Sequence, residues 1–103
     1  MQLFKDIYQE TETWPRVQVF GLIMDIRRAA MGIPSNLGGG PRQPSWHDFL
    51  EFLSISQDSL AELKTHLLLA QKNPALLSAD LEPLLRQVQD LDDKLQRLAA
   101  SGT

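Results

Sequence analysis

Apolar residues recur at every third or fourth position along most of this chain, which is the spacing of one face of an α-helix. The pattern is clearest between residues 45 and 72. The apolar positions on that face are Trp46, Phe49, Leu50, Leu53, Leu60, Leu63, Leu67 and Ala70. Ser45 is a favoured N-cap residue and Asp48 falls in the first turn. We therefore expect a helix from about Ser45 to Lys72.

Three further stretches show the same period. The last has one apolar face, made of Leu81, Leu84, Leu85, Val88, Leu91, Leu95 and Leu98, and Asp80 is its candidate N-cap. The second stretch has a face made of Val19, Leu22, Ile23, Ile26, Ala29, Ala30, Ile33 and Leu37. Pro34 lies inside that stretch and is expected to bend or end the helix. The first stretch, with Leu3, Phe4, Ile7 and Tyr8, is so short that it must dock on the others.

Proline and glycine separate these four stretches. The breaks are Trp14-Pro15, the triple glycine at 38–40 with Pro41 and Pro44, and Asn73-Pro74. Alternation of apolar and polar residues never lasts long enough to indicate a strand. The pattern predicts an all-α protein. We expect an antiparallel up-and-down four-helix bundle with a short first helix and a proline-kinked second helix, forming a single domain over residues 1–103.

Composition and charge narrow the functional classes. The chain has 103 residues, 43% of them hydrophobic and 22% charged, which is typical of one folded domain. It has no cysteine, which excludes disulfides and thiolate chemistry. The longest purely apolar run, 67–70, is far too short to cross a membrane, and the first ten residues do not resemble a signal peptide. We expect a cytoplasmic protein without membrane contact. A net charge of −3 argues against a dedicated nucleic-acid binder.

No group of residues in the sequence suggests catalysis or cofactor binding. The triple glycine lacks the lysine that a phosphate-binding loop requires, so we interpret it as a hinge. Glu62 and His66 have helical ligand spacing, but no third metal ligand is evident, and His47 lies nineteen positions from His66. No pair of carboxylates and no serine with histidine stands out as catalytic machinery. We predict no catalytic, cofactor-binding or metal-binding residues and no enzyme activity.

The strongest local concentration of basic residues is Arg27-Arg28, together with Arg42. Repeated around an oligomer, Arg27, Arg28 and Arg42 are candidate nucleic-acid contacts. The alternative is that one of the two adjacent arginines pairs with a carboxylate of the third helix, either Glu62 or Asp58, because a partly buried arginine needs a partner.

Two segments match a known signature. Residues 21–36 read GLIMDIRRAAMGIPSN, and residues 49–63 read FLEFLSISQDSLAEL, followed by THLLLA at 65–70. Together they resemble the signature of the bacterial four-helix-bundle family of 23S rRNA intervening-sequence proteins. The chain departs from that signature at Asp25 (family glutamine), at Gly32 (family serine) and at 38–40, where the family has Ala-Glu-Gly. The first helix is also shorter than in the family, which implies a truncated start or an exposed groove.

The resemblance implies a non-enzymatic bundle that assembles as a homopentamer around a central channel. A related branch of the family serves reverse transcriptases as a nucleic-acid-holding accessory subunit. The motif positions carried over to this chain are Arg28, Ile33, Pro34, Asn36, Arg42, Ser59 and Glu62. We expect Arg28 to cross to Glu62 and set the register of the second and third helices. Our leading hypothesis is a self-assembling scaffold or accessory subunit without cofactors, and the alternative is a nucleic-acid-binding accessory protein.

Overall fold

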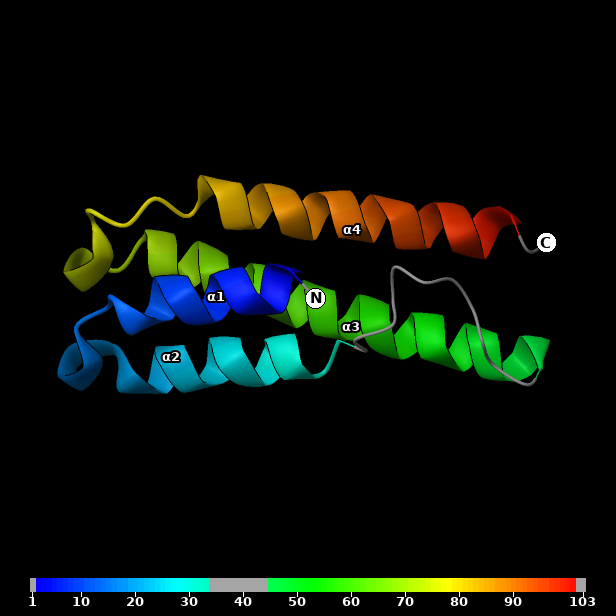
Figure 1. Cartoon of the computed structure of the whole chain (residues 1–103), viewed down its shortest axis with the longest axis horizontal. Helices are drawn as coiled ribbons and strands as arrows, with labels where there is room; N and C mark the ends of the chain where they lie inside the picture. Colours follow the sequence, from blue (N-terminus) through cyan, green and yellow to red (C-terminus); the bar gives the residue numbers. More distant parts are fainter. Residues whose placement is uncertain (1, 34–44, 102–103) are drawn as a thin grey trace.

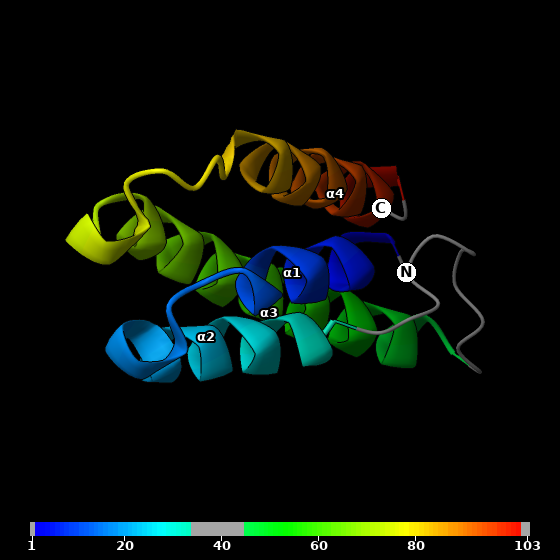
Figure 2. The ribbon, with the colours of Figure 1, turned by 60° about the vertical axis from the view of Figure 1, so that its left-hand side comes forward.

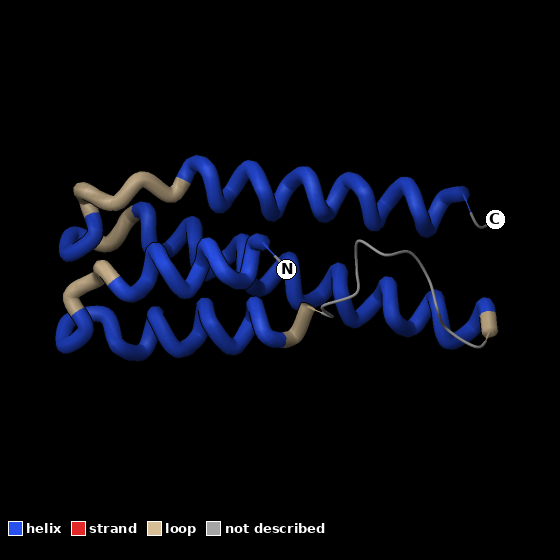
Figure 3. Tube along the Cα trace, in the orientation of Figure 1, coloured by secondary structure: helices blue, strands red, loops and turns tan. Residues whose placement is uncertain are grey.

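The computed structural model describes residues 2–33 and 45–101, and within them the fold is entirely helical. The elements are α1 (Gln2–Glu12), α2 (Arg16–Met31), α3 (Trp46–Gln71), the short 3₁₀ helix η2 (Pro74–Leu76) and α4 (Glu82–Ser101). Figure 3 shows helix and connecting loops in these residues and no strand. The prediction of an all-α protein is therefore confirmed.

The four long helices lie alongside one another, with α2 and α4 at opposite edges and α1 and α3 between them (Figure 1). The turned view in Figure 2 shows the same relation, with α1 on one side and α3 on the other. Followed by colour along the chain, successive helices run in opposite directions along the long axis (Figure 1). Each edge helix thus packs against both α1 and α3.

Local capping sets the ends of the longest helix and of its successor. The Ser45 hydroxyl accepts a hydrogen bond from the Asp48 backbone N–H at 3.1 Å, as expected for the N-cap of α3. Lys72 forms the C-cap of α3. Before α4, the Asp80 carboxylate accepts from the Glu82 backbone N–H at 3.2 Å. The helix predicted between residues 45 and 72 is confirmed, because capping and apolar spacing agree there.

The core forms where the apolar faces of the four helices meet. Its most completely buried members include Ile7, Ile23, Ile26, Leu53, Leu60, Leu63, Leu67, Leu81, Val88 and Leu95. Two positions assigned to the buried face of α3 differ: Trp46 and Leu50 are exposed. They lie in the first turns of α3, and 26 residues make α3 longer than the 16-residue α2 and the 11-residue α1.

Helix α2 has its irregularity near its beginning. Val19 has non-helical backbone angles (φ −128°, ψ 27°), so the first turn is set at an angle to the rest. The helix ends at Met31, where the Gly32 backbone N–H bonds back to carbonyls of the last turn. The kink predicted at Pro34 falls outside the described residues. The bend that the structure describes lies at Val19, a position that the sequence pattern did not identify.

Candidate interaction surfaces

Arg28, which was expected to cross to the third helix, lies on the exposed side of α2. Its side chain is 77% exposed, and its Nη1 lies 3.4 Å from Oδ1 of Asp25, one turn earlier in the same helix. The ion pairs of the described residues do not include one between Arg28 and Glu62. The expected pair is therefore wrong. An exposed pair of this kind contributes little to stability, about 0–1 kcal/mol.

Arg27 holds the inward position and joins α2 to α1. Its Nε donates to the Thr11 hydroxyl at 3.0 Å, and its Nη2 donates to the Glu12 carboxylate at 3.2 Å. The guanidinium carbon lies 4.3 Å from the centre of the Tyr8 ring, within the range of a cation–π contact. Thr11 itself donates to the Ile7 carbonyl at 2.8 Å. The Thr11 hydroxyl thus accepts one hydrogen bond and donates another. The buried guanidinium of Arg27 contacts Thr11, Glu12 and the Tyr8 ring.

This arrangement bears on both interpretations of Arg27 and Arg28. It corrects the expected carboxylate partner, and it reduces the number of candidate nucleic-acid contacts. The carboxylate that pairs with the buried arginine comes from α1 and not from Glu62 or Asp58 of α3. Arg27 is engaged within the bundle, so it is a poor candidate for a nucleic-acid contact. Arg28 is the exposed member of the pair, and Arg42 lies outside the described residues. The signal that could have indicated the α1 partners is the spacing of Tyr8, Thr11 and Glu12 on one helix face.

Gly32, just after α2, lies close to Ser59 of α3. A Cβ atom built on Gly32 would lie 2.6 Å from Ser59 Oγ and 3.4 Å from Ser59 Cβ. A side chain at position 32 would therefore require the serine to move. Ile33, the next residue, is buried. At position 32 the family has serine and this chain has glycine. The glycine lies in tight contact with Ser59, which is itself one of the family motif positions.

The remaining motif residues divide into two groups. Pro34, Asn36 and Arg42 lie outside the described residues, as does the triple glycine. Glu62 is described and lies exposed on α3. Ser59, in contact with Gly32, and the buried Ile33 are therefore the motif residues that the structure places at packed positions.

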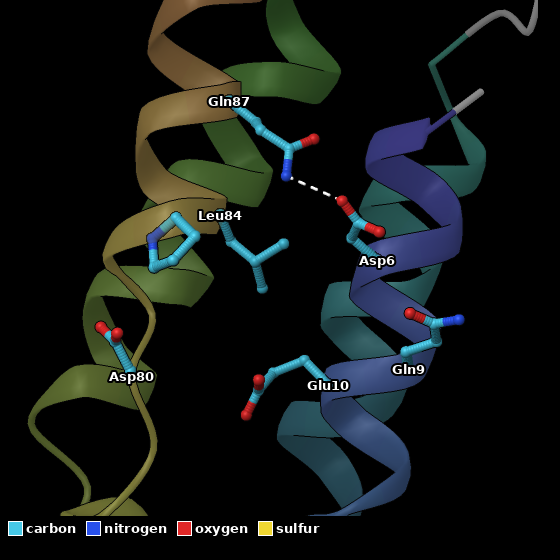
Figure 4. A pocket seen from close by; sticks show the side chains of 7 residues that line it. Asp6, Gln9, Glu10, Asp80, Leu84 and Gln87 are labelled. Atoms are coloured by element: carbon cyan, nitrogen blue, oxygen red, sulfur yellow. Dashed lines mark hydrogen bonds between the residues drawn. The ribbon is translucent and has the colours of Figure 1, made fainter.

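A hollow lined with carboxylates lies between α1 and the start of α4 (Figure 4). It measures about 260 Å³ and includes Asp6 and Glu10 of α1 and Asp80, which lies just before α4. Gln87 donates to Asp6 at 2.9 Å across the hollow. Each carboxylate already has a partner within the chain: Asp6 also accepts from Gln2, Glu10 from the Trp14 indole and Asp80 from the Glu82 backbone. The Gln87–Asp6 hydrogen bond therefore joins α4 to α1 across the hollow.

The outer face of α2 carries a row of exposed apolar side chains, which we call the α2 ridge. It consists of Val17, Phe20, Met24 and Met31, with exposed fractions of 95%, 53%, 39% and 66%. Gly21 lies exposed beside Phe20, and a Cβ built on Gly21 would have no neighbour within 4 Å beyond the adjoining residues and the backbone of its own helix. Phe20, Met24 and Met31 follow the spacing of one face of the regular part of α2, and Val17 lies before the bend at Val19. The ridge is apolar surface that the described part of the bundle leaves uncovered.

A shallow groove of about 200 Å³ runs between α3 and α4, and we call it the α3–α4 groove. Its lining residues are Leu60, Ala61, Lys64, Val88, Gln89 and Asp92. Leu60 and Val88 are almost completely buried and form its floor, whereas Ala61 is exposed and small. Lys64 Nζ donates to the Gln89 side chain at 3.3 Å on the wall. The floor is thus closed to solvent, and a hydrogen bond between α3 and α4 spans it.

The described residues contain no candidate for a metal site or a membrane-spanning helix. None of these residues forms a group of three or more histidine or acidic side chains placed to hold a metal ion. Within the same part of the chain, no helix combines the length and the apolar character needed to cross a bilayer.

Comparison with known proteins shows the family to which the chain belongs. A model of the 23S rRNA-intervening sequence protein family matches residues 1–97. Searches of curated proteins and of solved structures each found no match. The match spans nearly the whole chain, including α1, α2, α3 and most of α4. It includes both segments whose residues resemble the family signature. The chain therefore belongs to the 23S rRNA-intervening sequence protein family.

Proposed function

We propose that this protein is a non-enzymatic helical bundle that assembles with copies of itself and acts as a scaffold or accessory subunit in the cytoplasm. The assembling unit of this proposal is an antiparallel up-and-down bundle, and the family resemblance implies five copies in a ring. The observation that carries the proposal is the α2 ridge, where Val17 and Phe20 are more than half exposed on a helix whose opposite side is buried.

Two physical considerations support self-assembly. A chain of 103 residues buries a smaller fraction of its surface on folding than a larger domain does. Surface buried against a partner therefore makes a larger relative contribution to its stability. Burial of apolar surface contributes about 25 cal/mol per Å². Leu68 and Leu69 are 40% and 54% exposed on α3, whereas Phe52 of the same helix packs half-buried against the core.

Native mass tests the proposal. Sedimentation equilibrium at micromolar concentration should give a mass several times the 11.6 kDa of one chain, with a reversible decrease on dilution. Native mass spectrometry should then give the number of copies. A single chain mass at tens of micromolar would contradict the proposed function.

A further inference from the structure

We propose that α1 is a detachable helix, which leaves the bundle and unfolds as one unit while α2, α3 and α4 keep their packing. Arg27 is the residue that holds α1 in place. The motion takes place within one chain and does not depend on the proposed self-assembly. Its basis is the way in which α1 is attached to its two neighbours, α2 and α4.

Helix α1 contributes little apolar burial to the core. Its buried side chains are Leu3, Ile7 and Thr11, of which the last is polar, and Phe4 packs half-buried beside them. Helix α3, by contrast, has buried side chains along its length from Phe49 to Ala70. A helix of 11 residues is marginal by itself in water, so α1 loses its helical structure when it leaves its neighbours. Detachment and unfolding of α1 are therefore one event.

The side chains of α1 and α4 do not fill the space between the two helices. The hollow of about 260 Å³ lies there, and the residues of α1 that line it, Asp6, Gln9 and Glu10, are all polar (Figure 4). The hydrogen bond from Gln87 to Asp6 spans the hollow at 2.9 Å. When α1 leaves, these groups exchange their bonds within the protein for bonds to water, and the net cost of that exchange is small.

The polar attachment of α1 to α2 is concentrated at Arg27. Its guanidinium donates to the Thr11 hydroxyl at 3.0 Å and to the Glu12 carboxylate at 3.2 Å, and it lies over the Tyr8 ring. All three partners belong to the last five residues of α1. Hydrogen bonds weaken steeply when their distance and angle change. The contacts of Arg27 with α1 are therefore made together and lost together.

The other helices have contacts that do not involve α1. Helix α3 packs against α2 on one side and against α4 on the other. Figures 1 and 2 show α3 between these two helices and across the bundle from α1. Along the long axis of the molecule, α1 ends near the middle of α4, and the second half of α4 continues beyond it (Figure 1). Loss of α1 therefore leaves the α2–α3 and α3–α4 contacts in place.

Detachment changes what the protein presents to its surroundings. The side chain of Arg27 is 10% exposed while α1 is in place, and its charge becomes free when Thr11 and Glu12 leave. Leu84 of α4, which lines the hollow and is 4% exposed, loses its cover from α1 at the same time. The open form thus exposes a basic side chain and an apolar surface that the closed form hides.

Native-state hydrogen exchange at one fixed protein concentration tests the detachment. In the wild-type protein, the amides of α1 are expected to exchange as one group, at least about tenfold faster than the slowest amides of α3. Low concentrations of urea should change the α1 rates little, because unfolding of 11 residues exposes little surface. Exchange of α1 as slow as that of the α3 core would overturn the proposal.

A substitution far from α1 separates detachment from unfolding of the whole chain. Leu95 is fully buried and lies in the half of α4 beyond α1. Leu95→Ala should accelerate the slowest amides of α3 by about 30-fold, which corresponds to about 2 kcal/mol, and should leave the α1 rates within about twofold of wild type. Equal acceleration of α1 and α3 would show that α1 opens only when the whole chain unfolds. Leu95→Val is the milder form of the same test if circular dichroism shows that Leu95→Ala does not fold.

A pair of arginine variants tests what holds α1 in place. Arg27→Ala removes contacts that exist only while α1 is attached, so it should accelerate exchange in α1 by about 30-fold. Arg28→Ala is the matched control, because Arg28 is the adjacent arginine and its side chain is 77% exposed. It should change the α1 rates by less than about threefold. Equal effects of the two variants, or no effect of Arg27→Ala, would show that Arg27 does not hold the helix.

Discussion

Arg27 of α2 donates its Nε proton to the hydroxyl of Thr11 in α1 at a distance of 3.0 Å, and both side chains are buried. This bond joins two helices that follow one another in the sequence and differ in length. Helix α1 has 11 residues and is too short to be stable alone. The arginine supplies a polar attachment beside the apolar contacts of Leu3 and Ile7.

Removal of Arg27 should destabilise the fold, whereas removal of its neighbour should not. Arg27→Ala loses two charge-assisted hydrogen bonds, the contact with Tyr8 and the packing of a buried side-chain stem. We expect a loss of about 2–3 kcal/mol in the free energy of unfolding. Arg28→Ala removes an exposed pair and should change it by less than about 0.5 kcal/mol. Urea unfolding at one fixed protein concentration measures both, and equal losses would contradict the assignment of Arg27 as the buried partner.

Thr11→Val should isolate the contribution of the hydroxyl. Valine keeps the shape of the side chain but leaves the Arg27 Nε–H without its acceptor in a buried position. The expected loss is about 1–3 kcal/mol. Thr11→Ser keeps the hydroxyl and should cost less than Thr11→Val. In the background of Arg27→Ala, the effect of Thr11→Val should shrink by at least about 0.5 kcal/mol, and undiminished loss there would show that the two residues are not coupled.

Gly32→Ala should depend on the residue that faces it. Alanine at a helical backbone position reduces the entropy of the unfolded chain and stabilises a protein by about 0.4–1 kcal/mol when it fits. Here its Cβ would meet Ser59 Oγ at 2.6 Å, so the gain should be offset or reversed. In the Ser59→Ala background the close oxygen is gone and Gly32→Ala should stabilise. Thermal unfolding of the four proteins tests this, and an equal effect in both backgrounds would rule out the contact.

Gly21→Ala should stabilise the folded chain. The new methyl group meets nothing within 4 Å beyond its own helix. Alanine should therefore stabilise the folded chain by up to about 1 kcal/mol. Urea unfolding of both proteins at one fixed concentration measures the change, and an unchanged or lower free energy of unfolding would contradict this expectation.

Local patterns were sufficient for the helices themselves. The apolar period and Ser45 predicted a helix at 45–72, and α3 spans Trp46–Gln71 with that serine as its cap. Asp80 was predicted as the cap of the last helix and accepts the Glu82 N–H. Capping bonds and helical periods involve residues within a few positions of one another. The sequence therefore contains the information that determines them.

Only the tertiary structure decided which side chain faces which neighbour. Arg27 and Arg28 are adjacent and differ by about 100° around the helix, and their family resemblance favoured Arg28 as the bridge. In the structure Arg27 instead lies on the side of α2 that packs against α1, where it bonds to Thr11 and Glu12. The same holds for Gly32 against Ser59, and for the carboxylates that meet in the hollow of Figure 4. These contacts join residues far apart along the chain, so they depend on how whole helices pack, which no local period specifies.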